Sequence, residues 1–338
     1  MDREPAMSTF SLILPRRNST TIAVPTAIET MSESPHDLED LRRRIDEIDD
    51  RLQDLLIERV ELVSRVASHK RRNGGVAAHQ PAREAEIIRR LIERNRGAFP
   101  PAPLVRMWRE LLAATVRLQG PFAIAVYAPP DAPGFWDLAR DHYGSQTPMA
   151  GYRSTGQVIR AVTEGQAAVG VLPMPQEGDA DPWWRYLLST DGNAPRVISR
   201  LPFGARGNGR SDGGDALAIG RGEHQETGHD RTLFATENAL NISRGRIFSI
   251  LSALGLACTF IAACEHAEGA NTLIEIDGFV APSDPRLDRF RTQLGPALFR
   301  LLRFGGYAVP LAPAALAPVR PASDALPAAL AAGGAAKA

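Results

Sequence analysis

A stripe of apolar residues marks the stretch from Asp40 to Lys70 as one long amphipathic helix. The stripe recurs at alternating steps of four and three residues, at Leu41, Ile45, Ile48, Leu52, Leu55, Leu62 and Val66. The pattern predicts a helix from about Asp37 to Arg72, ended by the Asn-Gly-Gly at 73–75. Arg59 falls on the same steps, where an apolar side chain is expected. Because a buried guanidinium without a partner is costly, Arg59 needs an anion.

Two shorter helical patterns follow, which makes residues 35–119 an all-α segment of three helices. The second helix begins after Pro81 and buries a stripe of isoleucine and leucine before the Phe-Pro-Pro-Ala-Pro at 99–103 breaks it. The third is predicted from Leu104 to Gln119.

After Gly120 the pattern changes to short apolar runs alternating with helical ones, which predicts an α/β lobe over 121–222. Residues 230–311 are predicted to form an α+β domain of order βαββα, whose last helix extends to Gly305. The Ser-, Thr- and Pro-rich residues 1–34 are expected to be a disordered leader, and the Ala- and Pro-rich residues 312–338 a disordered tail.

Composition narrows the class of protein. The 338 residues carry zero formal net charge, which argues against a nucleic-acid-binding or membrane-surface protein. The sequence has no apolar run of the roughly 20 residues that a spanning helix needs. Two cysteines, Cys258 and Cys264, are too few for a disulfide framework, so we expect a cytoplasmic protein. We expect no metal ion and no cofactor.

Spacing along the first helix suggests a site shared between two chains. At 1.5 Å per residue, Arg59 and Lys70 are roughly 16 Å apart along the axis, so their long side chains could converge on one small anion. Arg42 is roughly 26 Å from Arg59 and cannot join them from the same helix. An antiparallel partner helix would bring a second Arg42 beside them. The sequence therefore predicts a homodimer in which Arg42 crosses the interface.

These positions resemble a known family, the all-α class of chorismate mutases. The family has Arg, Arg and Lys at this spacing in a long first helix, here Arg42, Arg59 and Lys70. The other matching positions are the Arg-Glu pair Arg83 and Glu84 in the second helix and the hydroxyl–Gln pair Thr115 and Gln119 in the third. Gln80 stands where the family commonly has Asp, and Thr115 where it often has Ser.

The resemblance implies a role for each residue. The family rearranges chorismate to prephenate, in phenylalanine and tyrosine biosynthesis, by a pericyclic shift that needs positioning and charge stabilisation only. Arg59 and the partner's Arg42 would clamp the two carboxylates, assisted by Thr115. Lys70 and Gln119 would donate to the ether oxygen. The remaining site residues are Glu84, which would accept from the ring hydroxyl, Arg83 nearby, and Gln80 through its backbone.

The later segments resemble two domains often fused behind such a mutase. Residues 124–175 are similar to the first lobe of prephenate dehydratase, which makes 121–222 a truncated dehydratase-like lobe. The α+β part is similar to the ACT regulatory domain that follows it. The dehydratase Thr-Arg-Phe triplet reads Gly214, Asp215, Ala216 here. The family's phenylalanine-binding stretch reads Ala262 to Glu265. We therefore expect a non-catalytic, ACT-like extension without a phenylalanine effect.

Three other interpretations remain open from the sequence. The chain could be a bifunctional mutase–dehydratase, although the changed triplet disfavours it. It could be an isochorismate pyruvate-lyase, because that chemistry uses a similar anion clamp. It could also be a non-enzymatic helical dimerisation module carrying a regulatory domain.

Overall fold

The computed structural model describes residues 38–72, 79–189, 191, 194–210 and 214–317, with the backbone alone at Lys70 and Arg71. The predicted leader lies outside these residues, and so does the predicted tail from 318 onward. The chain divides into two units, residues 1–57 and 58–338, and each is considered by itself.

The first long helix forms as predicted, as α1 (Leu38–Arg72). In the unit that ends at Ile57, its apolar stripe faces solvent: Leu41, Ile45, Ile48, Leu52 and Leu55 are each 49–59% exposed. An amphipathic helix is normally held by packing its apolar face against another element. The α1 stripe therefore lacks a covering element among the described residues of this unit.

The next two helices are α2 (Pro81–Arg94) and α3 (Pro101–Arg117), which confirms the three predicted helices. Both begin on a proline, whose fixed φ and missing N–H suit the first helical turn. For that reason α3 begins at Pro101 rather than at Leu104. The two helices pack on the sheet described below, in a core shared by Ala85, Ile88, Val105, Leu112, Phe203 and Ala308.

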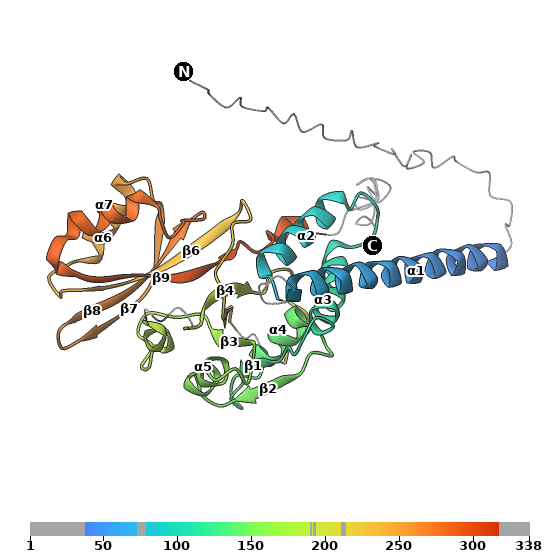
Figure 1. Cartoon of the computed structure of the whole chain (residues 1–338), viewed down its shortest axis with the longest axis horizontal. Helices are drawn as coiled ribbons and strands as arrows, with labels where there is room; N and C mark the ends of the chain where they lie inside the picture. The colour runs from blue at the N-terminus through green and yellow to red at the C-terminus, as the bar shows by residue number, and fades with distance from the viewer. Residues whose placement is uncertain (1–37, 73–78, 190, 192–193, 211–213, 318–338) are drawn as a thin grey trace, which may run out of the picture. The chain divides into compact units, whose positions relative to one another are not determined.

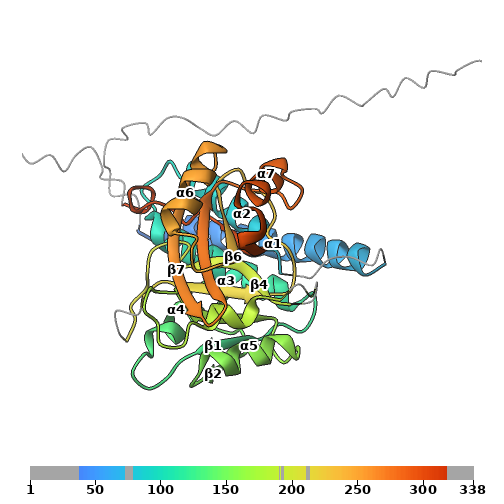
Figure 2. The ribbon, with the colours of Figure 1, turned by 90° about the vertical axis from the view of Figure 1, so that its left-hand side faces the viewer.

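The rest of the described chain forms one nine-stranded sheet of order β2-β1-β3-β5-β4-β9-β6-β8-β7 (Figures 1 and 2). Its strands are β1 (Ile124–Tyr127), β2 (Met149–Tyr152), β3 (Val169–Pro173), β4 (Arg196–Leu201), β5 (Ala216–Gly220), β6 (Asp230–Asn238), β7 (Cys258–His266), β8 (Gly269–Asp277) and β9 (Leu298–Ala308). The predicted α/β lobe and α+β domain thus share a sheet.

Helices cover both faces of the first half of the sheet. Along β1, Ala125 belongs to the core that contains α5 (Thr155–Thr163), whereas Ile124 and Val126 belong to the core that contains α4 (Gly134–Tyr143). Because successive strand residues point to opposite faces, α4 and α5 lie on opposite sides. The α5 core continues into the second half of the sheet through Trp183 and Trp184, in the 3₁₀ helix η1 (Trp183–Leu187).

The second half of the sheet corrects one prediction. The last predicted helix ends early, as α7 (Pro285–Leu294), and the chain continues through η2 (Gly295–Ala297) into β9. Gly295 has a positive φ of 58° and Pro296 follows it, a combination that stops a helix. With α6 (Arg244–Ala253), the order is βαββαβ, a ferredoxin-like arrangement in which α6 and α7 cover one face of the sheet (Figures 1 and 2).

The two halves meet where β4 runs parallel to β9, through the pair Val197 and Gly305. Gly305 has φ +123°, and a Cβ there would lie 2.2 Å from the Val197 carbonyl oxygen. Only glycine allows this approach, because any side chain would clash with backbone. The continuity of the sheet therefore depends on Gly305.

Ordered structure continues past Ala312, the predicted start of a disordered tail. The 3₁₀ helix η3 (Pro313–Leu316) follows, and Leu311 and Leu316 pack against the core that joins α2 and α3 to the sheet. None of the described helices combines the length and the apolarity needed to cross a membrane.

Candidate functional site

The first turn of α2 holds a buried carboxylate, Glu84. Gln80 is the N-cap, and its carbonyl accepts a hydrogen bond from the Glu84 backbone N–H at 3.1 Å. The Glu84 side chain is 11% exposed, and its Oε2 accepts a hydrogen bond from Arg109 Nη1 at 3.0 Å. The predicted acceptor therefore lies in a low-dielectric setting with a cationic partner.

Sequence reasoning missed Arg109. It lies on α3 with 5% of its side chain exposed, and its guanidinium sits 4.9 Å from the centre of the Phe203 ring. Burial lowers the pKa of Arg109, and the neighbouring Glu84 opposes that shift. A signal was present, because Arg109 is four residues after Val105 and three before Leu112, both in the buried stripe of α3. The same reasoning had singled out Arg59.

Arg59 lies on α1, in the unit that begins at Glu58, with its guanidinium 5.7 Å from the centre of the Trp108 ring. Its Nη1 atom is buried and has no hydrogen-bond partner among the described residues. Burial lowers the pKa of Arg59. A buried guanidinium nitrogen without an acceptor is the feature expected of a site that receives an anion.

Thr115 and Gln119 come together at the end of α3. Thr115 is buried, and its hydroxyl donates to the Leu112 carbonyl at 2.9 Å. Gln119 Nε2 donates to the Thr115 carbonyl at 3.1 Å. Both side chains are thus hydrogen-bonded to backbone carbonyls of α3.

The remaining predicted residues are Arg83, Arg42 and Lys70. Arg83 is exposed and donates to Glu86 at 2.9 Å, so it turns away from the buried Glu84. Arg42 is exposed on the first unit's part of α1. The backbone of Lys70 lies on α1, but its side chain lies outside the described residues.

Two histidines with buried side chains lie near the Glu84–Arg109 ion pair, His79 beside Glu84 and His142 near Arg109. His79 Nε2 lies 3.8 Å from Glu84 Oε1 and has no hydrogen-bond partner in the described structure. The His79 and His142 rings both contact Tyr143, edge-on, with centroids 5.7 and 4.7 Å away. Burial lowers the pKa of both histidines, for His142 well below 6.5, so both are neutral at pH 7.

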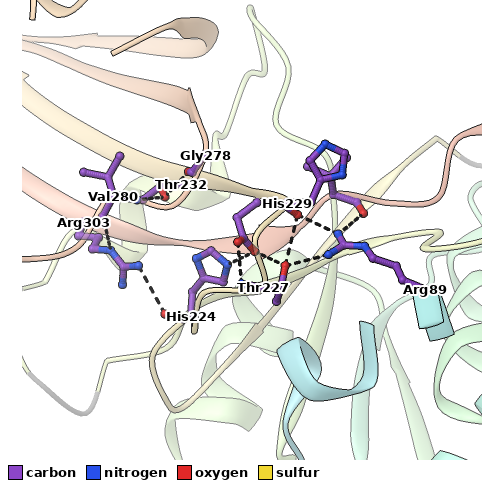
Figure 3. A network of polar contacts seen from close by, with 10 residues as sticks. Arg89, His224, Thr227, His229, Thr232, Gly278, Val280 and Arg303 are labelled. Atoms are coloured by element: carbon purple, nitrogen blue, oxygen red, sulfur yellow. Dashed lines mark hydrogen bonds and ion pairs between the residues drawn. The ribbon is translucent and has the colours of Figure 1, made fainter. Parts of the chain in front are cut away.

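A second arginine ties α2 to the sheet. Arg89 Nη1 donates to Thr227 Oγ1 at 2.9 Å, and its Nη2 donates to the carbonyls of His229 and Val309 at 2.8 and 2.7 Å. Figure 3 shows this guanidinium reaching from α2 to the segment that leads into β6. Arg89 also lies 5.7 Å from the centre of the Phe203 ring. Phe203 thus contacts one arginine from each of α2 and α3.

The helical part of the chain is similar to a known protein family. Residues 41–120 match the family model of chorismate mutase type II. The match falls within the helical part of the chain and confirms the resemblance to this family. The described residues contain no group of three side chains suited to hold a metal ion.

Curated relatives extend the comparison. The chain is 30% identical over 148 residues to a bifunctional chorismate mutase/prephenate dehydratase of Stutzerimonas stutzeri, covering 43% of this chain and 40% of the relative. It therefore spans about two fifths of the length of the curated relatives that it matches.

Among solved structures, a protein described as GqqA, a novel type of quorum quenching acylase, matches at 15% identity and a TM-score of 0.41. It covers 57% of this chain and 96% of that one. Prephenate dehydratase from Streptococcus mutans matches at 13% identity and a TM-score of 0.40, covering 56% and 98%. At these scores the structural likenesses carry no argument about function.

Proposed function

We propose that this protein is a chorismate mutase that converts chorismate to prephenate in a site on its helical domain. The observation that carries the proposal is the unsatisfied guanidinium of Arg59. Arg59 lies in the part of the chain that matches the mutase family, and its buried Nη1 has no acceptor among the described residues. A carboxylate of chorismate would supply that acceptor in bidentate geometry. Trp108 holds the guanidinium plane in place beside it.

The proposed site needs a second chain. Arg59 and the partner's Arg42 clamp the two carboxylates, with Thr115 assisting, and Lys70 and Gln119 donate to the ether oxygen. Glu84 accepts from the ring hydroxyl, with Arg83 and the backbone of Gln80 nearby. The exposed apolar stripe of α1 supports a homodimer, because an antiparallel copy would bury it and bring Arg42 across.

The rearrangement requires the protein only to hold the substrate and to stabilise the transition state. A pericyclic rearrangement needs no nucleophile, so rate comes from fixing a compact conformer of the substrate. As the ether bond breaks, charge develops on its oxygen, and donors aimed at that oxygen bind the transition state more tightly than the substrate. Lys70 and Gln119 take this role in the proposal.

The α/β lobe is proposed to be a non-catalytic extension. Asp215, at the place of the dehydratase triplet, accepts from Arg200 at 2.7 Å and from Arg206 at 2.6 Å. Its carboxylate therefore links the start of β5 to Arg200 on β4 and to Arg206 in the loop after β4. This arrangement favours a structural role over a bifunctional mutase–dehydratase. An ACT-like regulatory role for the ferredoxin-like half remains a proposal, with no phenylalanine effect on activity expected.

The test follows chorismate absorbance with the purified full chain, and then identifies the product. Accumulation of prephenate without phenylpyruvate supports the proposal. Phenylpyruvate would indicate the bifunctional alternative, isochorismate cleavage to pyruvate would indicate a lyase, and no turnover would leave a binding module. Lys70→Ala should abolish prephenate formation with the helical content by circular dichroism unchanged.

A further inference from the structure

Phe203 joins the sheet to the two helices that carry the proposed mutase residues. It follows β4, is 4% exposed, and contacts the guanidinium groups of Arg89 and Arg109. Stacking on an aromatic face fixes the plane of a guanidinium group and so the directions of its N–H donors. The sheet therefore sets the orientation of Arg109.

Arg109 in turn holds one oxygen of Glu84. Its Nη1 donates to Oε2 at 3.0 Å, while Oε1 lies 3.8 Å from His79 Nε2, beyond hydrogen-bond distance. Both charged side chains are almost fully buried, where an ion pair is screened very little. With Oε2 occupied, Oε1 is the oxygen that can accept from a substrate hydroxyl.

We propose that Arg109, stacked on Phe203, is a positioning residue that keeps the Glu84 carboxylate oriented for the substrate hydroxyl. The inference rests on the proposed function, because Glu84 is a substrate contact only if the site is a mutase site. In this proposal the extension catalyses no reaction of its own. Its sheet supports the mutase site by holding Arg109 in position. Arg89 fixes the same helix to the sheet a turn and a half further along.

The experiment is a double-mutant cycle in the full chain. Arg109→Gln and Glu84→Gln are made singly and together, and kcat and KM for chorismate are measured. We expect Arg109→Gln to lower kcat/KM by about ten- to a hundredfold, because misplacing a contact by about 1 Å costs that much. In the Glu84→Gln background the same change should cost less than about threefold, because no carboxylate remains to be oriented.

Arg106→Gln is the matched control. Arg106 lies on the same helix and pairs with Asp141, yet it does not contact Glu84. We expect it to lower kcat/KM by less than about threefold in both backgrounds, since additive effects are the rule for uncoupled sites. Arg109→Lys, which keeps the charge, should restore part of the activity that Arg109→Gln loses.

Equal losses from Arg109→Gln in both backgrounds, or losses no larger than those of Arg106→Gln, would overturn the inference. If Arg109→Gln does not fold, Phe203→Leu replaces it in the same cycle, with the same expected and contrary results. A wild-type chain that does not consume chorismate would instead refute the proposed function. An active chain with an additive cycle would refute the positioning role alone.

Discussion

At the scale of single residues, the structure distinguishes arginines by what they meet. Arg83 is exposed and pairs with a neighbour on its own helix, a contact that contributes little to stability. Arg109 is buried on Glu84 and Phe203, and Arg59 is partly buried with one nitrogen unsatisfied. Burial without a partner is the feature that makes Arg59 a candidate for substrate binding.

Gln119 sets the expected pH dependence of the reaction. An amide donates a hydrogen bond at any pH, whereas a glutamic acid at the same place would have to be protonated first. We therefore expect kcat/KM for chorismate to be flat from about pH 6 to 8. Gln119→Glu should make activity rise as the pH falls toward about 5. A wild-type profile that rises only below about pH 5 would contradict the assigned role.

His142 sets the expected pH dependence of stability. Its pKa in the folded chain is well below its ordinary value of 6.5, so the unfolded chain binds this proton at a higher pH. The free energy of unfolding should therefore fall as the pH drops below 6.5, by up to about 1.4 kcal/mol per pH unit for each such histidine. His79 contributes in the same direction.

Urea unfolding at pH 7, 6 and 5 measures this effect. His142→Gln should remove about one proton from the pH dependence. An identical slope for wild type and His142→Gln would show that His142 is not buried in its neutral form.

At the scale of elements, the helices were predictable because each carries a local pattern. The starts and faces of α1 and α2 follow from apolar spacing and from Pro81. The predicted final helix is too long because Leu298, Leu301 and Leu302 continue a plausible helical stripe. The Gly295-Pro296 stop decides otherwise, and β9 then pairs with β6 and β4. Pairing between distant strands leaves no local pattern to read.

Contacts between distant segments also limited how much of the candidate site could be predicted. Arg42 and Arg59 stand out by their spacing along one helix, whereas Glu84 and Gln119 follow from the resemblance to the mutase family. The Arg109–Glu84 pair joins residues 25 positions apart on different helices, and Phe203 joins both to a loop after β4. Such contacts exist only once α2 and α3 have packed on the sheet. They could not be read from the spacing alone.

Helix α1 supplies the prediction about assembly. Leu52 lies within the exposed stripe, so Leu52→Glu places a charge in the proposed dimer interface. We expect the variant to sediment as a monomer and to lose chorismate mutase activity, because each site needs the partner's Arg42. Gln53→Glu adds the same charge beside the stripe and should remain dimeric and active. A fully active monomer would contradict the shared site.

Gly305 supplies the prediction about the sheet. Gly305→Ala combines backbone strain with a Cβ 2.2 Å from the Val197 oxygen, and it should cost about 2–6 kcal/mol of unfolding free energy. Gly278 also has a positive φ, +90°, but a Cβ there would meet nothing within 4 Å. Gly278→Ala should therefore cost only the strain, about 1–3 kcal/mol. Equal costs in urea unfolding would show that β4 and β9 can separate freely.

At the scale of the whole molecule, the chain joins a helical mutase-like segment to one continuous sheet. Arg89, Arg109 and Phe203 make that attachment within the second unit. The proposed activity, by contrast, depends on a second copy of the chain through α1. The extension and the partner chain would then support the site in different ways. The extension orients Glu84, and the partner supplies Arg42.

Complementation between two inactive variants is the sharpest test of a site shared between two chains. Arg42→Ala and Arg59→Ala chains should each be inactive alone. When they are co-expressed in equal amounts, half of the dimers should be mixed, and each mixed dimer should hold one intact site. We expect about a quarter of the wild-type rate of prephenate formation per chain. No recovery of activity in mixed dimers that have been shown to form would contradict it.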